Sequence, residues 1–234
     1  MTMTEIDRVL ITGVDTRLGA AVRDHFAGRG ALTVGTVTAR RDDGPAGELV
    51  VADPADRPEV GDAVAKAAAH MGGIDVLVVA HALPVVAPFA EQSMAEFWRH
   101  VDATLTGSFL YAQVAAEHMR HNGTGGRIVL TTSRWHVGGD NLAAVATAAG
   151  GIVALTKSLT RDFGGFGIGV NAVALGALDS EWSVCDASAG EPPGGRVGSV
   201  EQAAAVIGLL SRRQLGAAVG QIVNVDGGLS RNRV

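Results

Sequence analysis

The sequence predicts a single-domain α/β fold, in which a doubly wound, seven-stranded, mainly parallel sheet carries helices on both faces. Three observations predict it. The 234 residues fit one domain of the larger α/β kind. Short runs rich in Val, Ile and Leu recur at regular intervals, and helical stretches fill the gaps between them. Strand followed by helix, repeated, requires right-handed crossovers and therefore a parallel sheet. No internal repeat or low-complexity linker divides residues 1–234, so we expect one domain.

Most of the predicted strands are nearly continuous in aliphatic residues rather than alternating with polar ones. This pattern is typical of strands that are covered on both faces in a parallel sheet. In chain order the strands are "RVLITG" (8–13), "ALTVGTVT" (31–38), "ELVVAD" (48–53), "DVLVVA" (75–80), "RIVLTT" (127–132), "GVNAVA" (169–174) and "QIVNVDGG" (221–228).

The first predicted helix follows the first strand. In it Leu18, Val22 and Phe26 recur every four residues on one face. The further helices are predicted over 57–71, 94–121, 141–163 and 200–211.

Two further expectations concern a pair of aromatic residues and one irregular segment. Phe97 and Trp98 are expected in the core. The irregular segment 175–199 is rich in Gly, Pro and Ser and follows the sixth strand. Because a loop at the carboxyl end of such a strand borders the ligand crevice, this segment is a candidate lid.

Composition excludes several classes of function. The formal charge of -5 and the pI near 5.8 provide no basic field for phosphate backbones, so we expect no nucleic-acid partner. We expect no membrane partner and a cytoplasmic protein, because no apolar run approaches the length of a membrane span and "MTMTEIDRVL" lacks the features of a secretory signal. The single cysteine, Cys185, agrees with a reducing compartment and has no thiol partner, and no metal site is predicted.

A glycine turn joins the first strand to the first helix. In "LITGVDTRLGAAV", Gly13 directly follows the strand and Gly19 lies in the first turn of the helix. There the pyrophosphate of a dinucleotide would meet backbone N–H groups and the positive end of the helix dipole. Taken alone, the motif is also explained by a turn that merely connects strand and helix.

With this turn the chain resembles the short-chain dehydrogenase/reductase family, and within it proteins like the 3-oxoacyl-ACP reductases. Thr12, Gly13, Leu18 and Gly19 match the family pattern T-G-x-x-x-G-[IL]-G, but Arg17 stands at the middle glycine. That side chain would either obstruct a pyrophosphate or pair with it as a cation. The resemblance extends from position 8 to position 228, through "GRIVLTTS", "GVNAVALG" and "GQIVNVDGG", and implies a Rossmann-like fold.

The resemblance also bears on the cofactor. "ADPAD" (52–56) resembles the family's D-x-x-D, which implies that Asp53 holds the adenine amino group. No acidic residue at 36–38 is available for a ribose 2′-hydroxyl, whereas Arg40 and Arg41 follow soon after. If a dinucleotide binds at all, the 2′-phosphorylated form, NADP(H), is therefore favoured. An exposed turn in which the arginines neighbour two aspartates explains them equally well.

The resemblance implies a proton relay that this sequence lacks. The family uses a tyrosine, a lysine four residues later, a serine, and an asparagine on the preceding helix. Ser133 stands at the serine, but Val145 and Ala149 stand at the tyrosine and lysine, and neither can transfer a proton. The single tyrosine and the two lysines of the chain form no Y-x-x-x-K pair. Other family positions also differ, namely Thr104 for the asparagine, "VAHA" (79–82) for N-N-A-G, and Leu175 for a proline.

Other side chains are candidates to replace the relay. "TTSRWHVGGD" (131–140) places Ser133 and His136 around the mouth of the site, and His81 would project from a neighbouring strand end. A histidine beside a serine is suited to acid–base or nucleophilic catalysis, although exposed loop histidines explain both positions too. Trp135 would either stack on a flat ligand or cover the sheet edge.

These observations predict a protein of this fold that has lost the standard hydride-transfer machinery. It would act as a non-redox catalyst or as a small-molecule-binding or accessory protein. The Ala- and Gly-rich, Lys-poor composition is typical of a GC-rich bacterial genome, where such relatives often accompany biosynthetic pathways, so we expect a role in bacterial biosynthesis. The alternative is an unconventional NADP(H)-dependent carbonyl or alcohol oxidoreductase, with Ser133 and water, or His136, as proton donor. A third reading is a structural partner of an active homologue.

The helix over 141–163 is small-sided and apolar on nearly every face, and the sheet alone cannot cover its whole circumference. In the family the long helices pack against the same pair of a second subunit. We therefore expect a homodimer or homotetramer formed through the helices near 94–121 and 141–163.

Overall fold

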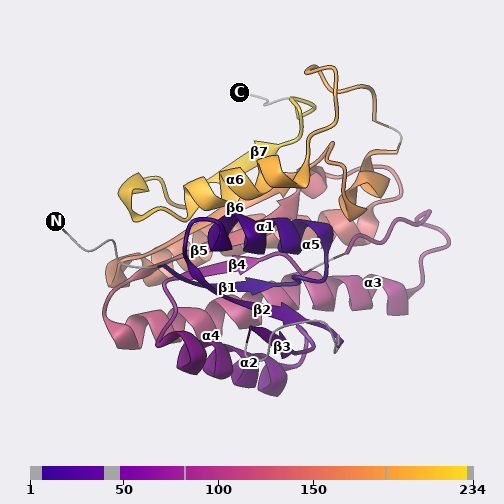
Figure 1. The fold of residues 1–234 in the computed structure, drawn as a ribbon. Coiled ribbons are helices and arrows are strands. Elements are labelled where there is room, and N and C mark those ends of the chain that lie inside the picture. Colours follow the sequence, from indigo (N-terminus) through magenta and orange to yellow (C-terminus); the bar gives the residue numbers. More distant parts are fainter. Residues whose placement is uncertain (1–6, 40–47, 82, 188, 231–234) are drawn as a thin grey trace.

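In the part of the chain that the structure describes, seven parallel strands form one sheet in the order β3-β2-β1-β4-β5-β6-β7 (Figure 1), which confirms the predicted fold class. The structure is a computed structural model that describes residues 7–39, 48–81, 83–187 and 189–230. The strands are β1 (Arg8–Thr12), β2 (Leu32–Val37), β3 (Leu49–Val51), β4 (Val76–Val79), β5 (Gly126–Ser133), β6 (Ile168–Leu175) and β7 (Ile222–Val225). Because the strand order reverses between β1 and β4, the ligand crevice is expected at the carboxyl ends of these two strands.

Helices cover both faces of the sheet (Figure 1). On one face α1 (Arg17–Ala27) packs beside α6 (Val200–Leu210). On the other face lie α2 (Arg57–Met71), α4 (Gly107–Asn122) and α5 (Ala143–Phe163). The predicted helix over 94–121 is interrupted: α3 (Met94–Val101) continues through a π-helical turn, Asp102–Thr106, into α4.

The alternating side chains of the buried strands build two cores, one on each face. In β1, Val9 and Ile11 face α1 and α6, whereas Leu10 faces α2 and α4. Each side chain named here is fully buried. The sheet is therefore covered on both faces, as its aliphatic strands predict.

Local sequence explains where the helices begin. The Thr16 hydroxyl caps α1 by accepting a hydrogen bond from the Gly19 amide, and Asp56 caps α2 in the same way. Ser93 and Ser199 open α3 and α6 with capping boxes, each with a Glu or Gln three residues later.

The tryptophan of α3 departs from expectation. Trp98 is 53% exposed and Phe97 is half-buried, so the prediction that both lie in the core is wrong for Trp98. The reason is the position of the helix: α3 packs against α5 at the periphery rather than across the centre of the sheet (Figure 1).

One helix is long and apolar enough to cross a membrane by length and composition alone. It spans Ala143–Phe166, an 18-residue window within it has a mean hydropathy of 1.3, and the expectation that no apolar run reaches this length is wrong. Packing explains its composition, because α5 lies on β5 and β6. Its side chains buried there are Ala144, Val145, Ala148, Ala149, Ile152, Thr156 and Leu159. A core helix passes the same test, so this is weak evidence for a membrane span.

Candidate functional site

The turn after β1 has the close-packed geometry that its glycines predict. Gly13 has a φ of +69°, a backbone conformation that favours glycine, and a Cβ at this position would collide with the Cα of His81. A Cβ at Gly19 would collide with the carbonyl of Gly13. The Leu18 side chain is buried in the core beneath α1. The turn therefore brings the N-terminus of α1 to the ends of β1 and β4.

Arg17 is paired with the candidate lid. Its guanidinium donates two hydrogen bonds to Asp179, at 2.9 and 3.0 Å from the two carboxylate oxygens. Its backbone N–H donates to Oε1 of Glu181 at 2.8 Å. The pairing raises the pKa of Arg17 and lowers that of Asp179. The sequence leaves two roles open for Arg17: to pair with a phosphate as a cation, or to obstruct it. In this structure the guanidinium is paired with a carboxylate of the protein itself, that of Asp179.

This conformation does not fit the pyrophosphate of a dinucleotide. A pyrophosphate needs the free N–H groups at the start of α1 and a positive potential. Here the Arg17 N–H is bound by Glu181, and the Gly19 N–H by Thr16 at 3.0 Å. Asp15, which accepts a 3.3 Å hydrogen bond from Thr38, adds a further carboxylate to the same turn.

The adenine end of the predicted cofactor site is only partly described. Asp53 is exposed after β3, where the family motif implies it. One carboxylate oxygen accepts from the Ala55 amide at 2.9 Å, and the Asp53 amide donates to Glu59. Contact with an adenine amino group stays a prediction. Arg40 lies outside the described residues.

Ser133 ends β5 with its side chain almost completely buried. Its hydroxyl oxygen accepts a hydrogen bond from the Trp135 amide at 3.2 Å. His136 lies nearby and half-buried, but its Nδ1 bonds the backbone carbonyl of Ser133 at 3.0 Å. Since a carbonyl only accepts, Nδ1 is the protonated nitrogen. His136 therefore bonds the backbone of Ser133 and not its hydroxyl, so the two residues are not paired as a nucleophile and a base.

His81 lies two residues after the end of β4, in a buried hydrogen-bond network. Nε2 lies 2.7 Å from the carbonyl of Ala103, so Nε2 carries the proton and Nδ1 accepts from the Thr12 hydroxyl, also at 2.7 Å. The same hydroxyl accepts from the Ala80 amide. Burial lowers the pKa of His81 to about 4, so the ring is neutral at pH 7. Both nitrogens are used, which leaves none for a substrate.

The π-helical turn and a glycine make room for this histidine. The turn supplies the Ala103 carbonyl, since the Gly107 N–H bonds Asp102, five residues back, instead of Ala103. At Gly107 a Cβ would lie 2.6 Å from Nε2 of His81.

The two residues that the resemblance aligns with the family's tyrosine and lysine, Val145 and Ala149, are buried in this structure. Val145 and Ala149 are 1% and 3% exposed, and neither carries a polar side-chain atom. The hydroxyl of Thr104, at the asparagine position, is buried and has no hydrogen-bond partner among the residues described. Tyr111 cannot substitute, because its hydroxyl donates to Thr36 in the core and burial raises its pKa to about 12.

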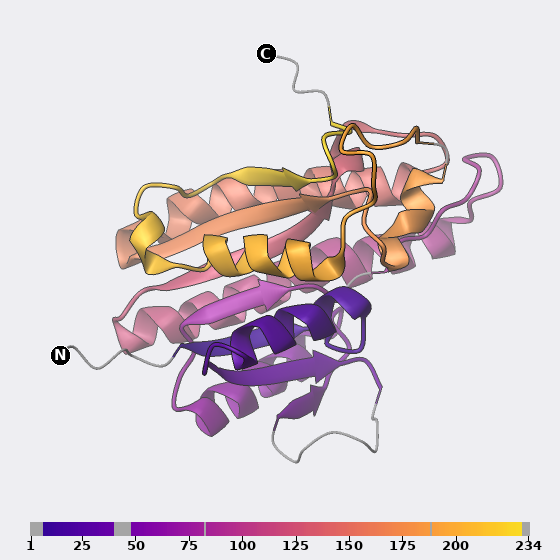
Figure 2. The same cartoon turned by 45° about the horizontal axis from the view of Figure 1, so that its top comes forward.

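The candidate lid is fastened over the end of β5 by a buried ion pair that sequence reasoning missed. Nε of Arg134 lies 2.7 Å from Oδ1 of Asp186, and these side chains are 8% and 10% exposed. The same carboxylate accepts from the Trp135 indole at 3.0 Å and from the Ala177 amide at 2.7 Å. Figure 2 shows this loop, in orange, at the end of the sheet to which the strands point. The Trp135 indole N–H therefore helps to hold the lid.

The remaining reactive groups lie elsewhere. Burial, with Asp186 beside it, raises the pKa of the Cys185 thiol to about 12, so it is not a nucleophile at neutral pH. Within 7–39, 48–81, 83–187 and 189–230, no group of three His, Cys, Asp or Glu side chains is arranged to hold a metal ion.

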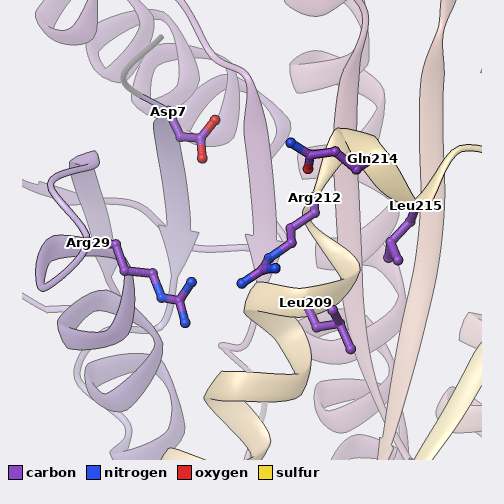
Figure 3. A pocket seen from close by; sticks show the side chains of 6 residues that line it. All are labelled: Asp7, Arg29, Leu209, Arg212, Gln214 and Leu215. Carbon is purple, nitrogen blue, oxygen red and sulfur yellow. The ribbon is translucent and has the colours of Figure 1, made fainter. Parts of the chain in front are cut away.

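A separate pocket of about 410 Å³ lies at the amino ends of the strands. Its lining includes Arg29 and Arg212, whose guanidinium groups face one another in Figure 3. It is at the opposite end of the sheet from Ser133 and is therefore not part of the candidate site.

A family model described as "Enoyl-(Acyl carrier protein) reductase" matches residues 18–230. The chain belongs to the short-chain dehydrogenase/reductase family. It is 32% identical to the cis-4-hydroxycyclohexanecarboxylate dehydrogenase of Sinomonas cyclohexanicum, with 94% of both chains covered. It is 27% identical to the 3-oxoacyl-[acyl-carrier-protein] reductase MabA of Mycobacterium tuberculosis, with 94% of this chain and 92% of the relative covered.

The fold of this short-chain dehydrogenase/reductase is shared with solved structures. The ligand-free aldohexose dehydrogenase of Thermoplasma acidophilum superposes with a TM-score of 0.87 at 22% identity, and 98% of this chain and 96% of that chain are covered. Members of the family generally bind NAD(P)(H). In this member, Glu181 accepts a hydrogen bond from the Arg17 amide at the start of α1.

Proposed function

We propose that this member of the short-chain dehydrogenase/reductase family does not perform the family's hydride transfer and instead acts on or binds a small molecule, as a non-redox catalyst or as an accessory protein. One observation supports the proposal: Val145 and Ala149, which the resemblance aligns with the family's proton-donating tyrosine and its lysine, are both aliphatic and buried. A valine can neither give nor take a proton, so the carbonyl oxygen of a substrate would have no acid at that position.

The other polar groups of the site support this proposal. The neutral ring of His81 is fully hydrogen-bonded, and the Ser133 hydroxyl caps the turn at Trp135. A serine hydroxyl without a paired base does not exchange protons readily at neutral pH.

The names of the relatives suggest a ligand class. They name a hydroxylated cyclohexane carboxylate and a 3-oxoacyl chain as the molecules those enzymes act on. We therefore propose a mainly apolar ligand that carries an oxygen function, bound between the end of β5 and the lid. Bacterial biosynthesis and a cytoplasmic location stay predictions.

A cofactor-consumption assay tests the proposal. We expect no NADPH or NADH oxidation above the buffer rate with a 3-oxoacyl thioester or with 4-oxocyclohexanecarboxylate, and a rate at least about 100-fold below that of MabA assayed alongside. Turnover near that of MabA would contradict it.

The second candidate is an unconventional NADP(H)-dependent oxidoreductase, and His136 favours it. This half-buried imidazole lies beside Ser133, and its Nε2 has no hydrogen bond to another described residue. Measurable turnover that is lost in both Ser133→Ala and His136→Asn, but retained in the control His121→Asn at an exposed position of α4, would establish this candidate in place of the first.

We also propose that the chain assembles as a homodimer or homotetramer through α3, α4 and α5. The outer face of α5 is made of small side chains that no described part of the chain covers, among them Thr147 and Ala154. Large apolar side chains on the neighbouring helices are also exposed, namely Met94, Trp98 and Phe109. Apolar surface of this kind is typical of interfaces.

Mass measurement in solution tests the assembly. The unmodified protein is expected as a dimer or tetramer at micromolar concentration, and Ala154→Arg is expected to yield monomers, because the arginine would be buried without a partner. Lys66→Arg on α2 is a control that should keep the assembly. A monomeric unmodified protein would contradict the proposal, and a stable complex with a co-expressed active homologue would replace it with the structural-partner reading.

A further inference from the structure

We infer that Glu181, supported by Asp179, is a built-in occupant of the pyrophosphate position and selects against dinucleotides at the proposed ligand site. The inference rests on the proposed function only in where the ligand binds. It concerns which ligands this site admits, whereas the proposed function concerns the chemistry after binding.

The first step is the contact itself. α1 is an eleven-residue helix, and its N-terminus carries a partial positive charge that attracts anions. The Glu181 carboxylate lies at this N-terminus and accepts a 2.8 Å hydrogen bond from the Arg17 amide, as a phosphate oxygen would. One of the N–H donors at the start of α1 is therefore already bound by a carboxylate.

The second step is charge. Arg17 could offset the charge of an incoming phosphate, but both of its terminal nitrogens are bonded to Asp179. With Asp15 on the same turn, three carboxylates and one guanidinium surround the N-terminus of α1. A dinucleotide would add two or more negative charges to a region that already carries a net negative charge. Its phosphates would therefore be repelled by the neighbouring carboxylates.

The third step is how the carboxylates are held. The Asp179 amide donates to the Gly198 carbonyl at 2.8 Å, and the Gly198 amide donates to Ala177 at 2.8 Å. On the other side, the ion pair at Asp186 fixes the lid to β5. The segment that carries Asp179 and Glu181 is thus anchored at both ends, so an anion must compete with carboxylates that are already in place.

The fourth step is the second oxygen of Glu181. Oε2 is buried and has no hydrogen-bond partner among the described residues. A buried carboxylate oxygen without a donor costs free energy, so this contact is satisfied on one oxygen only. We therefore expect that a substitution of Glu181 readily breaks its hydrogen bond with the Arg17 amide.

An NADPH titration followed by nicotinamide fluorescence tests the inference, and it reads binding rather than turnover. We expect weak binding by the unmodified protein and at least about tenfold tighter binding by Glu181→Gln, which keeps the shape and removes the charge. Asp179→Asn, which frees Arg17, is expected to shift affinity in the same direction. The matched control is Glu191→Gln, which removes one charge from an exposed position of the same loop and should change the affinity by less than about twofold.

Three outcomes would overturn the inference. Equal changes of NADPH affinity in Glu181→Gln and Glu191→Gln would mean that the net charge of the loop, and not the position of Glu181, sets the affinity. Tight binding by the unmodified protein, unchanged in Glu181→Gln, would mean that the carboxylate does not compete. Absence of binding in Glu181→Gln, Asp179→Asn and Arg17→Gly alike, with unchanged circular dichroism, would assign the exclusion to other residues. None of these depends on turnover, whereas the proposed function fails on turnover alone.

Discussion

Replacing Asp186 by alanine is expected to lower the free energy of unfolding by about 3–5 kcal/mol. The guanidinium of Arg134, whose side chain is 8% exposed in the ion pair, would lose its carboxylate, and the Trp135 indole and the Ala177 amide would lose their acceptor as well. A buried charge without a partner is among the most destabilising changes available to a single substitution. Urea unfolding followed by circular dichroism measures the loss.

The chain offers a matched control for this ion pair. Asp179 is an aspartate of the same loop that also pairs with an arginine, but the Arg17 and Asp179 side chains are 52% and 75% exposed. Asp179→Ala should therefore change stability far less, because exposed pairs are screened by solvent. The double variant Arg134→Met/Asp186→Leu is expected to recover much of the loss, since it leaves no buried charge. Equal effects of Asp186→Ala and Asp179→Ala would contradict the prediction.

Acidification is expected to destabilise the protein through His81, by on the order of 3 kcal/mol between pH 6.5 and pH 4, because one pKa unit is worth about 1.4 kcal/mol. The folded pKa of about 4 lies below the usual value near 6.5, so the unfolded chain binds a proton in this range and the folded chain does not. Stability from this group is complete above pH 6.5, falls as the pH drops through the window, and falls no further below pH 4.

The measurement compares two profiles of unfolding free energy against pH. His81→Gln is expected to be less stable at pH 7, because it loses the bonds to Thr12 and Ala103, but its profile should be flatter than that of the unmodified protein between pH 6.5 and 4. The difference between the profiles removes the contribution of the carboxylates, which titrate in both proteins. His121→Gln, at an exposed position of α4, should run parallel to the unmodified protein. A parallel profile for His81→Gln would show that His81 is not the group responsible.

Local patterns predicted the fold well because its elements are specified locally. The helix predicted over 57–71 begins and ends as α2 does, since Asp56 caps it, Pro58 lies in its first turn and Gly72 adopts the left-handed conformation that ends it. The continuous aliphatic runs placed each strand within a few residues of its observed bounds.

The interruption between α3 and α4 could not be predicted, because the π-helical turn depends on a tertiary contact. The carbonyl of Ala103 bonds to His81, which lies 22 residues earlier in the chain. No feature of the sequence over 94–121 signals that partner.

The candidate site was predicted unevenly for the same reason. Gly13 and Gly19 follow from a local turn, and their close packing agrees with it. The hydrogen bonds of His81 were not predicted, because its partners Thr12 and Ala103 lie 69 and 22 residues away. Asp179, Glu181 and Asp186 were missed because an irregular segment has no periodicity to show which of its carboxylates face inward.

The lid contacts join the first and last parts of the chain, which has a consequence for synthesis. The contact from Arg17 to Asp179 closes a separation of 162 residues, and that from Arg134 to Asp186 closes one of 52. Contacts over such separations form late, after the nearby strand–helix pairs have assembled. During translation the turn at Gly13 leaves the ribosome long before the residues that cover it. On the nascent chain, the N-terminus of α1 is therefore open to anions until the lid has been made.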